Sequence, residues 1–297
     1  MITRRKAIKN AAMGAGAIGL GLLSCDTADG KTPAGQDQNE NTMGTAKFKH
    51  SVCRWCYNDI PLEELCEKSV DLGIKSVEII GPDDWKVIEK YGLTCGMGNA
   101  PFISLVDGMN NPKNFQPLLE GYTKLFKQAA DMGIPNIICF SGNRNGLDDE
   151  TGLENCATCI DPIAKEAEKH GVMLCMELLN SKVNHKDYQC DHTPWGVQLV
   201  EKVGSPNFKL LYDIYHMQIM EGDVIATIRK YKDHIAHYHT GGVPGRNEIN
   251  ETQELYYPAI MKAIVDLGYE GFVAQEFVPT WDDKLAALAE GVKICSV

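Results

Sequence analysis

Short apolar runs alternate along the chain with longer stretches in which apolar residues recur at helical spacing. The short runs contain β-branched and other apolar residues, a composition typical of buried strands. We predict eight strands, at Phe48–Cys53, Ser76–Ile80, Leu93–Gly98, Asn136–Phe140, Val172–Leu178, Phe208–Tyr212, Ile235–Tyr238 and Gly271–Phe277.

The stretches between these runs predict helices, because their apolar residues fall on one face of a 3.6-residue period. They cover Leu62–Leu72, Leu118–Ala130, Ile163–Ala167, Val197–Val203, Ile225–Tyr231, Ile260–Leu267 and Leu285–Val292. Three helices should stop at a glycine, at Gly73, Gly133 and Gly268.

Eight strand–helix units over residues 47–297 have about 31 residues each, the usual size in a (β/α)8 barrel. We therefore predict an α/β fold, a TIM barrel that forms a single domain at 47–297. A doubly wound open sheet is the alternative, but no Gly-x-Gly-x-x-Gly motif opens a first helix in this part of the chain.

The first 46 residues have a different character. Arg4, Arg5 and Lys6 precede the charge-free run Ala11–Leu23, which is too short to span a bilayer comfortably. We predict an export signal over residues 1–25, with an uncleaved helix or short membrane anchor as the alternative. The paired arginines resemble a twin-arginine signal, and residues 22–25 resemble a bacterial lipobox ending at Cys25.

Residues 26–46 contain little to bury and are expected to form a flexible tether. Together with the export signal, this tether predicts an exported bacterial protein, either periplasmic or a membrane-anchored lipoprotein. Its membrane contact would then be limited to the N-terminal signal or lipid.

Charge narrows the classes of partner. The 297 residues carry 29 basic and 40 acidic side chains, net −11. Removing the four cations of residues 1–25 leaves 25 basic against 40 acidic groups, net −15. Because a surface with this much negative charge repels phosphate backbones, we expect no nucleic-acid partner. The composition also permits a homo-oligomer.

The ten cysteines after Cys25 could form disulfides in an exported protein, but residues 47–297 can bury a core large enough to need none, so both redox states remain open. Two Cys-x-x-Cys pairs, Cys53/Cys56 and Cys156/Cys159, offer an alternative zinc or redox motif. Their surroundings contain nothing further to support it.

Four successive predicted strands end in or near a polar residue, namely Glu177, Asp213, His239 and Glu276. A single acid at such a place is often only a helix cap. In a closed barrel, however, the four converge, and buried carboxylates repel one another unless a cation neutralises them. Three carboxylates and an imidazole suit Mn²⁺ or Mg²⁺, with Co²⁺ and Zn²⁺ as alternatives.

The runs Tyr212–His216, His237–Gly241 and Gly245–Glu248, between Glu177 and Glu276, resemble the xylose isomerase-like TIM barrels. The likeness is to the hydroxypyruvate isomerase and ketose 3-epimerase branch and covers about 47–295. It implies that Glu177, Asp213, His239 and Glu276 hold one divalent metal, and that both glutamates also transfer protons. It further implies that His216 and Arg246 contact substrate oxygens.

The residue types suit that chemistry. Moving a carbonyl between neighbouring carbons requires removal of an α-proton and stabilisation of an enediolate, which a divalent metal and a carboxylate base can provide. Arg246 would bind a substrate carboxylate, unless it is merely an exposed loop arginine. His216 could instead be a core histidine. We expect a small hydroxy-keto acid or sugar as substrate, with hydroxypyruvate to tartronate semialdehyde as the most similar reaction.

Weaker signals surround this set. Trp55, Asn180 and His185 are further candidates for substrate binding. We expect His237 to be structural and to face away from His239. Other candidate lining residues are His50, Arg54, Tyr57, Asn99, Ser141 and Lys182.

Three alternatives remain open, namely a ketose 3-epimerase, a non-catalytic carbohydrate-binding lipoprotein and an apurinic endonuclease. Related ketohexose epimerases usually carry a further substrate-binding glutamate six residues after the first metal glutamate. This chain has Val183 at that position, which disfavours a ketose 3-epimerase. Export favours a scavenged sugar or sugar acid over cytoplasmic hydroxypyruvate. A non-catalytic carbohydrate-binding lipoprotein would use the barrel without turnover. An apurinic endonuclease would need more metal ligands and a basic face.

Overall fold

A computed structural model describes residues 48–297, so the predicted export signal (1–25) and tether (26–46) lie outside the described residues. Within that range there are seven strands and nine α-helices. The strands are β1 Lys49–Cys53, β2 Ser76–Glu78, β3 Asn136–Cys139, β4 Met173–Glu177, β5 Phe208–Asp213, β6 Ile235–Thr240 and β7 Phe272–Gln275. The helices are α1 Leu62–Asp71, α2 Pro82–Glu89, α3 Phe115–Asp131, α4 Asp149–His170, α5 Thr193–Val203, α6 Ile214–Met220, α7 Val224–Tyr231, α8 Tyr257–Asp266 and α9 Lys284–Cys295.

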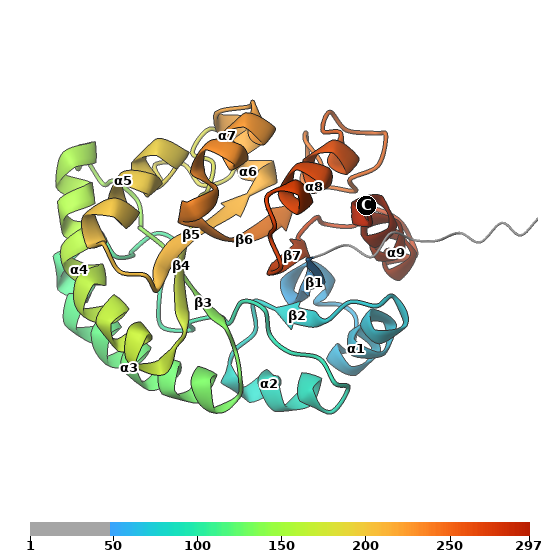
Figure 1. Ribbon diagram of the computed structural model, residues 1–297, viewed down its shortest axis with the longest axis horizontal. Helices are drawn as coiled ribbons and strands as arrows, with labels where there is room; N and C mark the ends of the chain where they lie inside the picture. The colour runs from blue at the N-terminus through green and yellow to red at the C-terminus, as the bar shows by residue number, and fades with distance from the viewer. Residues whose placement is uncertain (1–47) are drawn as a thin grey trace, which may run out of the picture. The chain divides into compact units, whose positions relative to one another are not determined.

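The strands form one parallel sheet in the order β2-β1-β7-β6-β5-β4-β3. Residues 94–98 join its two edges, because Thr94 bridges Ser76 in β2 and Gly98 bridges both Ile80 and Ile137. The sheet thereby closes, with the helices outside the ring of strands (Figure 1). The predicted TIM barrel is confirmed.

The third predicted strand, Leu93–Gly98, is wrong as a regular strand, since it makes only isolated bridges. Two glycines explain the irregularity. A Cβ on Gly96 would lie 2.9 Å from Glu78 Oε2, and one on Gly98 would lie 2.6 Å from Ile137 Cδ1. The neighbouring side chains occupy the space that side chains of this segment would need, and glycine also weakens a strand.

The helices that the sequence predicts are all present, and their glycine stops are confirmed. Gly73, Gly133 and Gly268 have φ of +73°, +67° and +74°, left-handed values that terminate a helix at little steric cost.

Helices α2 and α6 were not predicted. Helix α2 buries only Trp85 and Ile88, too few for a recognisable period, although Pro82 at its start is a favourable first residue. In α6, five of the seven residues are buried, so no polar face marks it as a helix.

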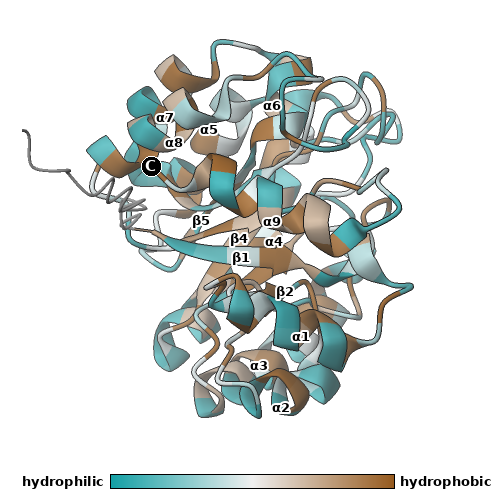
Figure 2. Cartoon of the chain, turned by 90° about the vertical axis from the view of Figure 1, so that its right-hand side faces the viewer, coloured by the Kyte–Doolittle hydropathy of each residue, from teal (hydrophilic) through white to brown (hydrophobic). Residues whose placement is uncertain are grey.

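The core lies on both faces of the strands, as expected for a parallel sheet covered by helices. In Figure 2 brown, hydrophobic stretches lie around β4 and β5, in the middle of the molecule. All ten cysteines of residues 48–297 are buried free thiols. Among these same residues, no helix combines the length and apolar character needed to cross a bilayer.

Candidate active site

The carboxyl ends of four neighbouring strands bring the predicted metal ligands together. Glu177 and Asp213 are the last residues of β4 and β5, His239 lies in β6 opposite Asp213, and Glu276 follows β7. All four side chains are buried, and each offers a ligand atom within 4.8 Å of the others. The predicted convergence is therefore present in the structure.

His239 is central to this group. Its Nδ1 lies 2.8 Å from Glu276 Oε2 and 3.4 Å from Glu177 Oε1. Asp213 has two roles, since its Oδ1 accepts from the backbone N–H of His216 at 3.0 Å and so caps α6. The helix-cap interpretation of that aspartate is correct, but its other oxygen still faces the group.

Arg246, in the loop between β6 and α8, supplies a positive charge to the same carboxylates. Its Nη2 lies 2.7 Å from Glu276 Oε2 and 3.4 Å from Asp213 Oδ2. The guanidinium lies over the rings of Trp55 and Tyr215, with centroids at 5.0 and 5.4 Å. Only 13% of this side chain is exposed, which excludes a solvated loop arginine.

The surroundings move the acidities of the two glutamates in opposite directions. Burial raises the pKa of Glu177, and the nearby charge of Glu276 adds to this effect. Burial would also raise the pKa of Glu276, but the charges of His239 and Arg246 outweigh it and hold that pKa well below its usual value. Such a divergence is typical of acid and base partners in active sites.

Asp213 and His239 are strongly perturbed as well. Burial raises the pKa of Asp213 well above its usual value despite the nearby Arg246. Burial lowers the pKa of His239, but the negative charge of Glu276 more than compensates and raises it well above its usual value. Both pKa values are thus set by burial and by the charges of the same cluster.

The residues present fit a divalent metal. Three carboxylates and one imidazole make an oxygen-rich donor set of the kind that Mn²⁺ and Mg²⁺ prefer. Glu177 Oε1 is buried and has no hydrogen-bond partner, which is a costly state for a carboxylate oxygen. A cation held by these four side chains would satisfy that oxygen and remove the repulsion among the acids.

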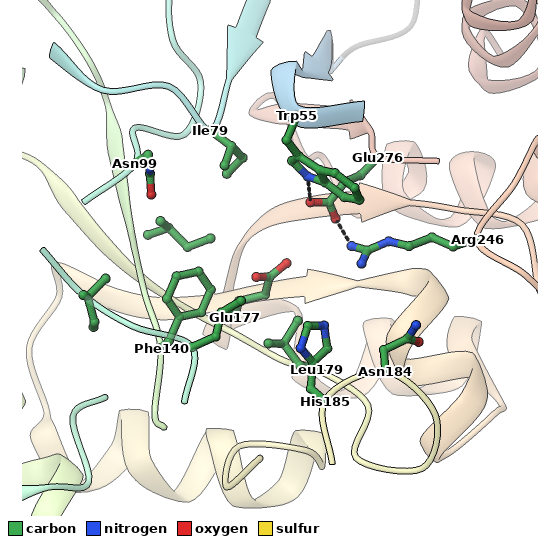
Figure 3. A pocket seen from close by; sticks show the side chains of 13 residues that line it. Trp55, Ile79, Asn99, Phe140, Glu177, Leu179, Asn184, His185, Arg246 and Glu276 are labelled. Atoms are coloured by element: carbon green, nitrogen blue, oxygen red, sulfur yellow. Dashed lines mark hydrogen bonds and ion pairs between the residues drawn. The ribbon is translucent and has the colours of Figure 1, made fainter. Parts of the chain in front are cut away.

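A pocket of about 570 Å³ opens beside these residues. At one end lie Glu177, Glu276, Arg246 and His185, and Trp55 Nε1 donates to Glu276 Oε1 at 2.8 Å (Figure 3). The remaining lining is Ile79, Asn99, Ile103, Leu105, Ile138, Phe140, Leu179 and Asn184. The pocket is therefore charged at one end and mainly apolar elsewhere.

Two of the predicted substrate-binding residues lie behind the pocket wall. His216 is fully buried, and its Nδ1 accepts from the backbone N–H of Asn180 at 3.1 Å. The Asn180 side chain accepts from the backbone N–H groups of Val183 and Asn184 and so shapes the loop that carries His185. Neither His216 nor Asn180 is among the lining residues, so both support the wall from within.

Of the weaker candidates, Trp55, Asn99 and His185 line the pocket. The others contact the protein elsewhere: His50 meets Ser296, Arg54 meets the carbonyls of Tyr57 and Ile60, Tyr57 is in the core, Ser141 accepts from the Cys190 N–H, and Lys182 donates to the carbonyls of Ile219 and Met220.

The prediction for His237 is wrong in one respect. Residues two apart on a strand share a face, and His237 and His239 both point at Glu78, whose Oε1 lies 2.8 and 2.9 Å from their Nε2 atoms. Sequence reasoning missed Glu78, although it too is a carboxylate near the end of a predicted strand. Within residues 48–297, no candidate ligand group includes Cys56, Cys156 or Cys159, so the zinc alternative receives no support.

Comparison with known proteins agrees with this geometry. A family model described as xylose isomerase-like TIM barrel matches residues 67–294. A putative hydroxypyruvate isomerase of Homo sapiens is 26% identical over 248 residues, covering 80% of this chain and 82% of the relative. The hydroxypyruvate isomerase of Escherichia coli K12 is 29% identical over 231 residues, covering 72% and 86%.

Among solved structures, an AP endonuclease of family 2 from Brucella melitensis superposes with a TM-score of 0.74 at 26% identity. The match covers 82% of this chain and 96% of that one.

Proposed function

Because the chain belongs to the xylose isomerase-like TIM barrel family, we propose that it is a metal-dependent isomerase that interconverts a small hydroxy-keto acid or sugar through an enediolate. A hydroxypyruvate isomerase and a putative hydroxypyruvate isomerase match over most of the chain, and these matches support assignment of the chain as an isomerase. The finer proposal is that it acts like those enzymes, on hydroxypyruvate and tartronate semialdehyde or a closely related sugar acid.

One observation carries the proposal. Two buried glutamates, Glu177 and Glu276, line the same pocket, and an oxygen of each lies within 3.4 Å of the same nitrogen, Nδ1 of His239. Isomerisation needs a group to take a proton from one carbon and a group to return it to the next. A pair of carboxylates with diverging pKa values meets that need.

In the proposed reaction, a proton leaves C3 of hydroxypyruvate and an enediolate forms. A proton is then added to C2, while the hydroxyl proton passes from the C3 oxygen to the C2 oxygen, giving tartronate semialdehyde. A divalent metal held by Glu177, Asp213, His239 and Glu276 would act as a Lewis acid that lowers the energy of the enediolate.

The glutamates differ in how firmly they are held. Trp55 donates to Glu276 Oε1, while Arg246 and His239 engage Oε2. Glu177 Oε1, in contrast, has no hydrogen-bond partner. We assign proton transfer to both, with Glu177 as the less constrained carrier.

Arg246 is proposed to bind the substrate carboxylate. Its Nη2 contacts Glu276 and Asp213, and the residue lines the pocket with 13% of its side chain exposed. The guanidinium therefore presents a positive charge to the pocket, and its planar fork of donors suits a carboxylate. This argues for an acid rather than a neutral sugar as substrate.

The alternatives are less well supported. Val183, 68% exposed in the loop before His185, offers no carboxylate to a ketose, which disfavours a 3-epimerase. A nuclease like the Brucella neighbour would have to bind a polyanion, against a net charge of −15 over residues 26–297. A binding module would not need two glutamates facing one pocket.

The test is turnover by metal-loaded protein. Purified chain, stripped with chelator and reloaded with Mn²⁺ or Mg²⁺, is incubated in D2O with hydroxypyruvate, tartronate semialdehyde or free ketoses and followed by proton NMR. We expect deuterium at the carbons next to the carbonyl, with Mg²⁺ used for the spectra. Absence of exchange from every substrate, with metal bound, contradicts the proposal. Binding without exchange would favour the carbohydrate-binding alternative.

Asp213→Asn serves as the matched control for that experiment. It should lose both metal and exchange, because it removes a charged ligand while preserving shape and the cap of α6. Full metal occupancy in this variant would show that the ligand assignment is wrong.

A further inference from the structure

A fourth carboxylate, that of Glu78, lies next to His239 on the side away from the other ligands' contacts with Nδ1, and takes no part in the function proposed above. It is the last residue of β2, is completely buried and does not line the pocket. We propose that Glu78 is a positioning residue that fixes the orientation and tautomer of His239, so that Nδ1 of this histidine faces Glu177 and Glu276. The inference rests on the proposed metal site.

The contacts of Glu78 are specific. Its Oε1 lies 2.9 Å from His239 Nε2 and 2.8 Å from His237 Nε2, and its Oε2 accepts from Ser51 Oγ at 2.5 Å. These distances are those of hydrogen bonds to a charged acceptor. Three donors from two strands thus hold the carboxylate in place, and it in turn holds the imidazole.

The chemistry of the pair determines the tautomer. An ionised carboxylate only accepts hydrogen bonds, so Nε2 of His239 must carry the hydrogen that points at Glu78. The contacts fit an ionised Glu78, because its Oε1 faces two imidazole nitrogens and its Oε2 accepts from the Ser51 hydroxyl. Nδ1 is then the only nitrogen of His239 that can give a lone pair to a cation. Histidines that bind metals commonly donate their other N–H to a carboxylate in this way.

The backbone is shaped for this contact. Glu78 ends β2 opposite Cys53, and Ile79 follows with a φ of 58°, a left-handed value that is costly for a β-branched residue. This turn lets two successive residues face inwards, Glu78 towards His239 and Ile79 into the pocket. On the other side, a Cβ on Gly96 would lie 2.9 Å from Glu78 Oε2, so only glycine leaves room for the carboxylate.

A competing interpretation is a second metal at Cys53, Glu78 and His239, whose possible ligand atoms also lie close together. The Cys53 sulfur is 3.9 Å from both Glu78 Oε1 and His239 Nε2. Burial raises the pKa of this thiol well above its usual value, so it is a poor source of thiolate. Glu78 Oε1 is already occupied by two imidazole N–H groups, which favours the positioning role.

The experiment measures metal affinity and tautomer in the full chain. Metal-free wild type and Glu78→Gln are titrated with Mn²⁺ by calorimetry. We expect the variant to bind about 10–100-fold more weakly, as is usual when a partner of a metal-binding histidine is lost. Thr240→Val is the matched control. It removes a buried hydrogen bond to Gln275 from the same strand but touches no atom of Glu78, so Mn²⁺ affinity should not change.

The second readout is the nitrogen NMR spectrum of histidine-labelled protein loaded with Mg²⁺. In wild type, His239 should carry its hydrogen on Nε2, and in Glu78→Gln this preference should be lost or mixed. A wild-type hydrogen on Nδ1 overturns the proposal even if the variant fails to fold. Unchanged Mn²⁺ affinity in a folded Glu78→Gln also overturns it, as does a second bound metal that Cys53→Ser removes. Failure of wild type to bind any metal instead counts against the proposed function.

Discussion

Replacing Arg246 by methionine should destabilise the metal-free protein far more than the metal-loaded one. In the metal-free state the guanidinium lies 2.7 and 3.4 Å from oxygens of Glu276 and Asp213, and it shares Glu276 Oε2 with His239 Nδ1 at 2.8 Å. Methionine preserves most of the side-chain length and its contact with Trp55 and Tyr215 but removes the charge. The carboxylates are then buried with less compensation.

Removing one partner of a buried ion pair costs about 3–5 kcal/mol. For a domain of this size, each kcal/mol lowers the melting temperature by about 2–4 °C, so the metal-free variant should melt roughly 6–20 °C below wild type. With saturating Mn²⁺ the loss should be less than half as large, because the divalent ion neutralises the same acids. By the same linkage, Arg246→Met should bind Mn²⁺ more tightly than wild type.

The assay is thermal unfolding followed by circular dichroism, with EDTA and with Mn²⁺, alongside calorimetric titration. Arg144→Met is the control, because Arg144 pairs with Asp191 at 3.0 Å and contacts none of the proposed metal ligands. The decrease in melting temperature caused by Arg144→Met should be the same with and without metal. Equal losses for Arg246→Met in EDTA and Mn²⁺ would refute the idea that the guanidinium and the metal neutralise the same carboxylates.

Three further predictions follow from the sequence and the site. The mature chain should begin at a lipidated Cys25, and mass spectrometry showing an intact Met1 or an unlipidated start elsewhere would contradict this. Glu276→Gln should keep a weakened metal yet lower kcat by orders of magnitude with less effect on KM; near-normal turnover would assign proton transfer to another group. Because the pKa of His239 is raised, Mn²⁺ binding must release the proton of this imidazole. At pH values below that pKa, the affinity for Mn²⁺ should therefore increase about tenfold for each unit by which the pH rises. Titration in buffers of different ionisation enthalpy measures the released protons, and a pH-independent affinity between pH 6 and 8 would contradict the assignment.

The metal-ligand candidates could be predicted because each follows a simple rule. Glu177, Asp213, His239 and Glu276 interrupt or end apolar runs, and the ends of parallel strands meet at one edge of a barrel. Glu78 obeys the same rule but was overlooked, because its strand is only three residues long and Ile79 and Ile80 continue the apolar run beyond it. Its importance is visible only once β6 brings His237 and His239 to it.

The rest of the pocket depends on loops, whose paths the pattern of apolar residues does not determine. Phe140 and Leu179 are apolar residues just beyond strands, and nothing local distinguishes a pocket wall from core. His216 and Asn180 are the reverse case, because they are polar residues near strand ends and so were expected to contact the substrate. In the structure they bond to each other and to the loop behind the pocket wall instead.

The glycine segment at residues 94–98 has a consequence for motion. Here a regular ladder is replaced by isolated bridges. The Asn136 side-chain amide donates to the Gly96 carbonyl at 2.7 Å, and the Asn136 backbone carbonyl accepts from the Gly98 N–H at 2.8 Å. Local opening is cheapest where backbone pairing is sparse, so amide exchange should be fastest along this seam of the barrel. The chain that leaves the seam carries Asn99 and Ile103 to the pocket. We therefore expect the apolar wall of the pocket, which this segment leads into, to open locally more often than the regularly paired strands that carry the charged end.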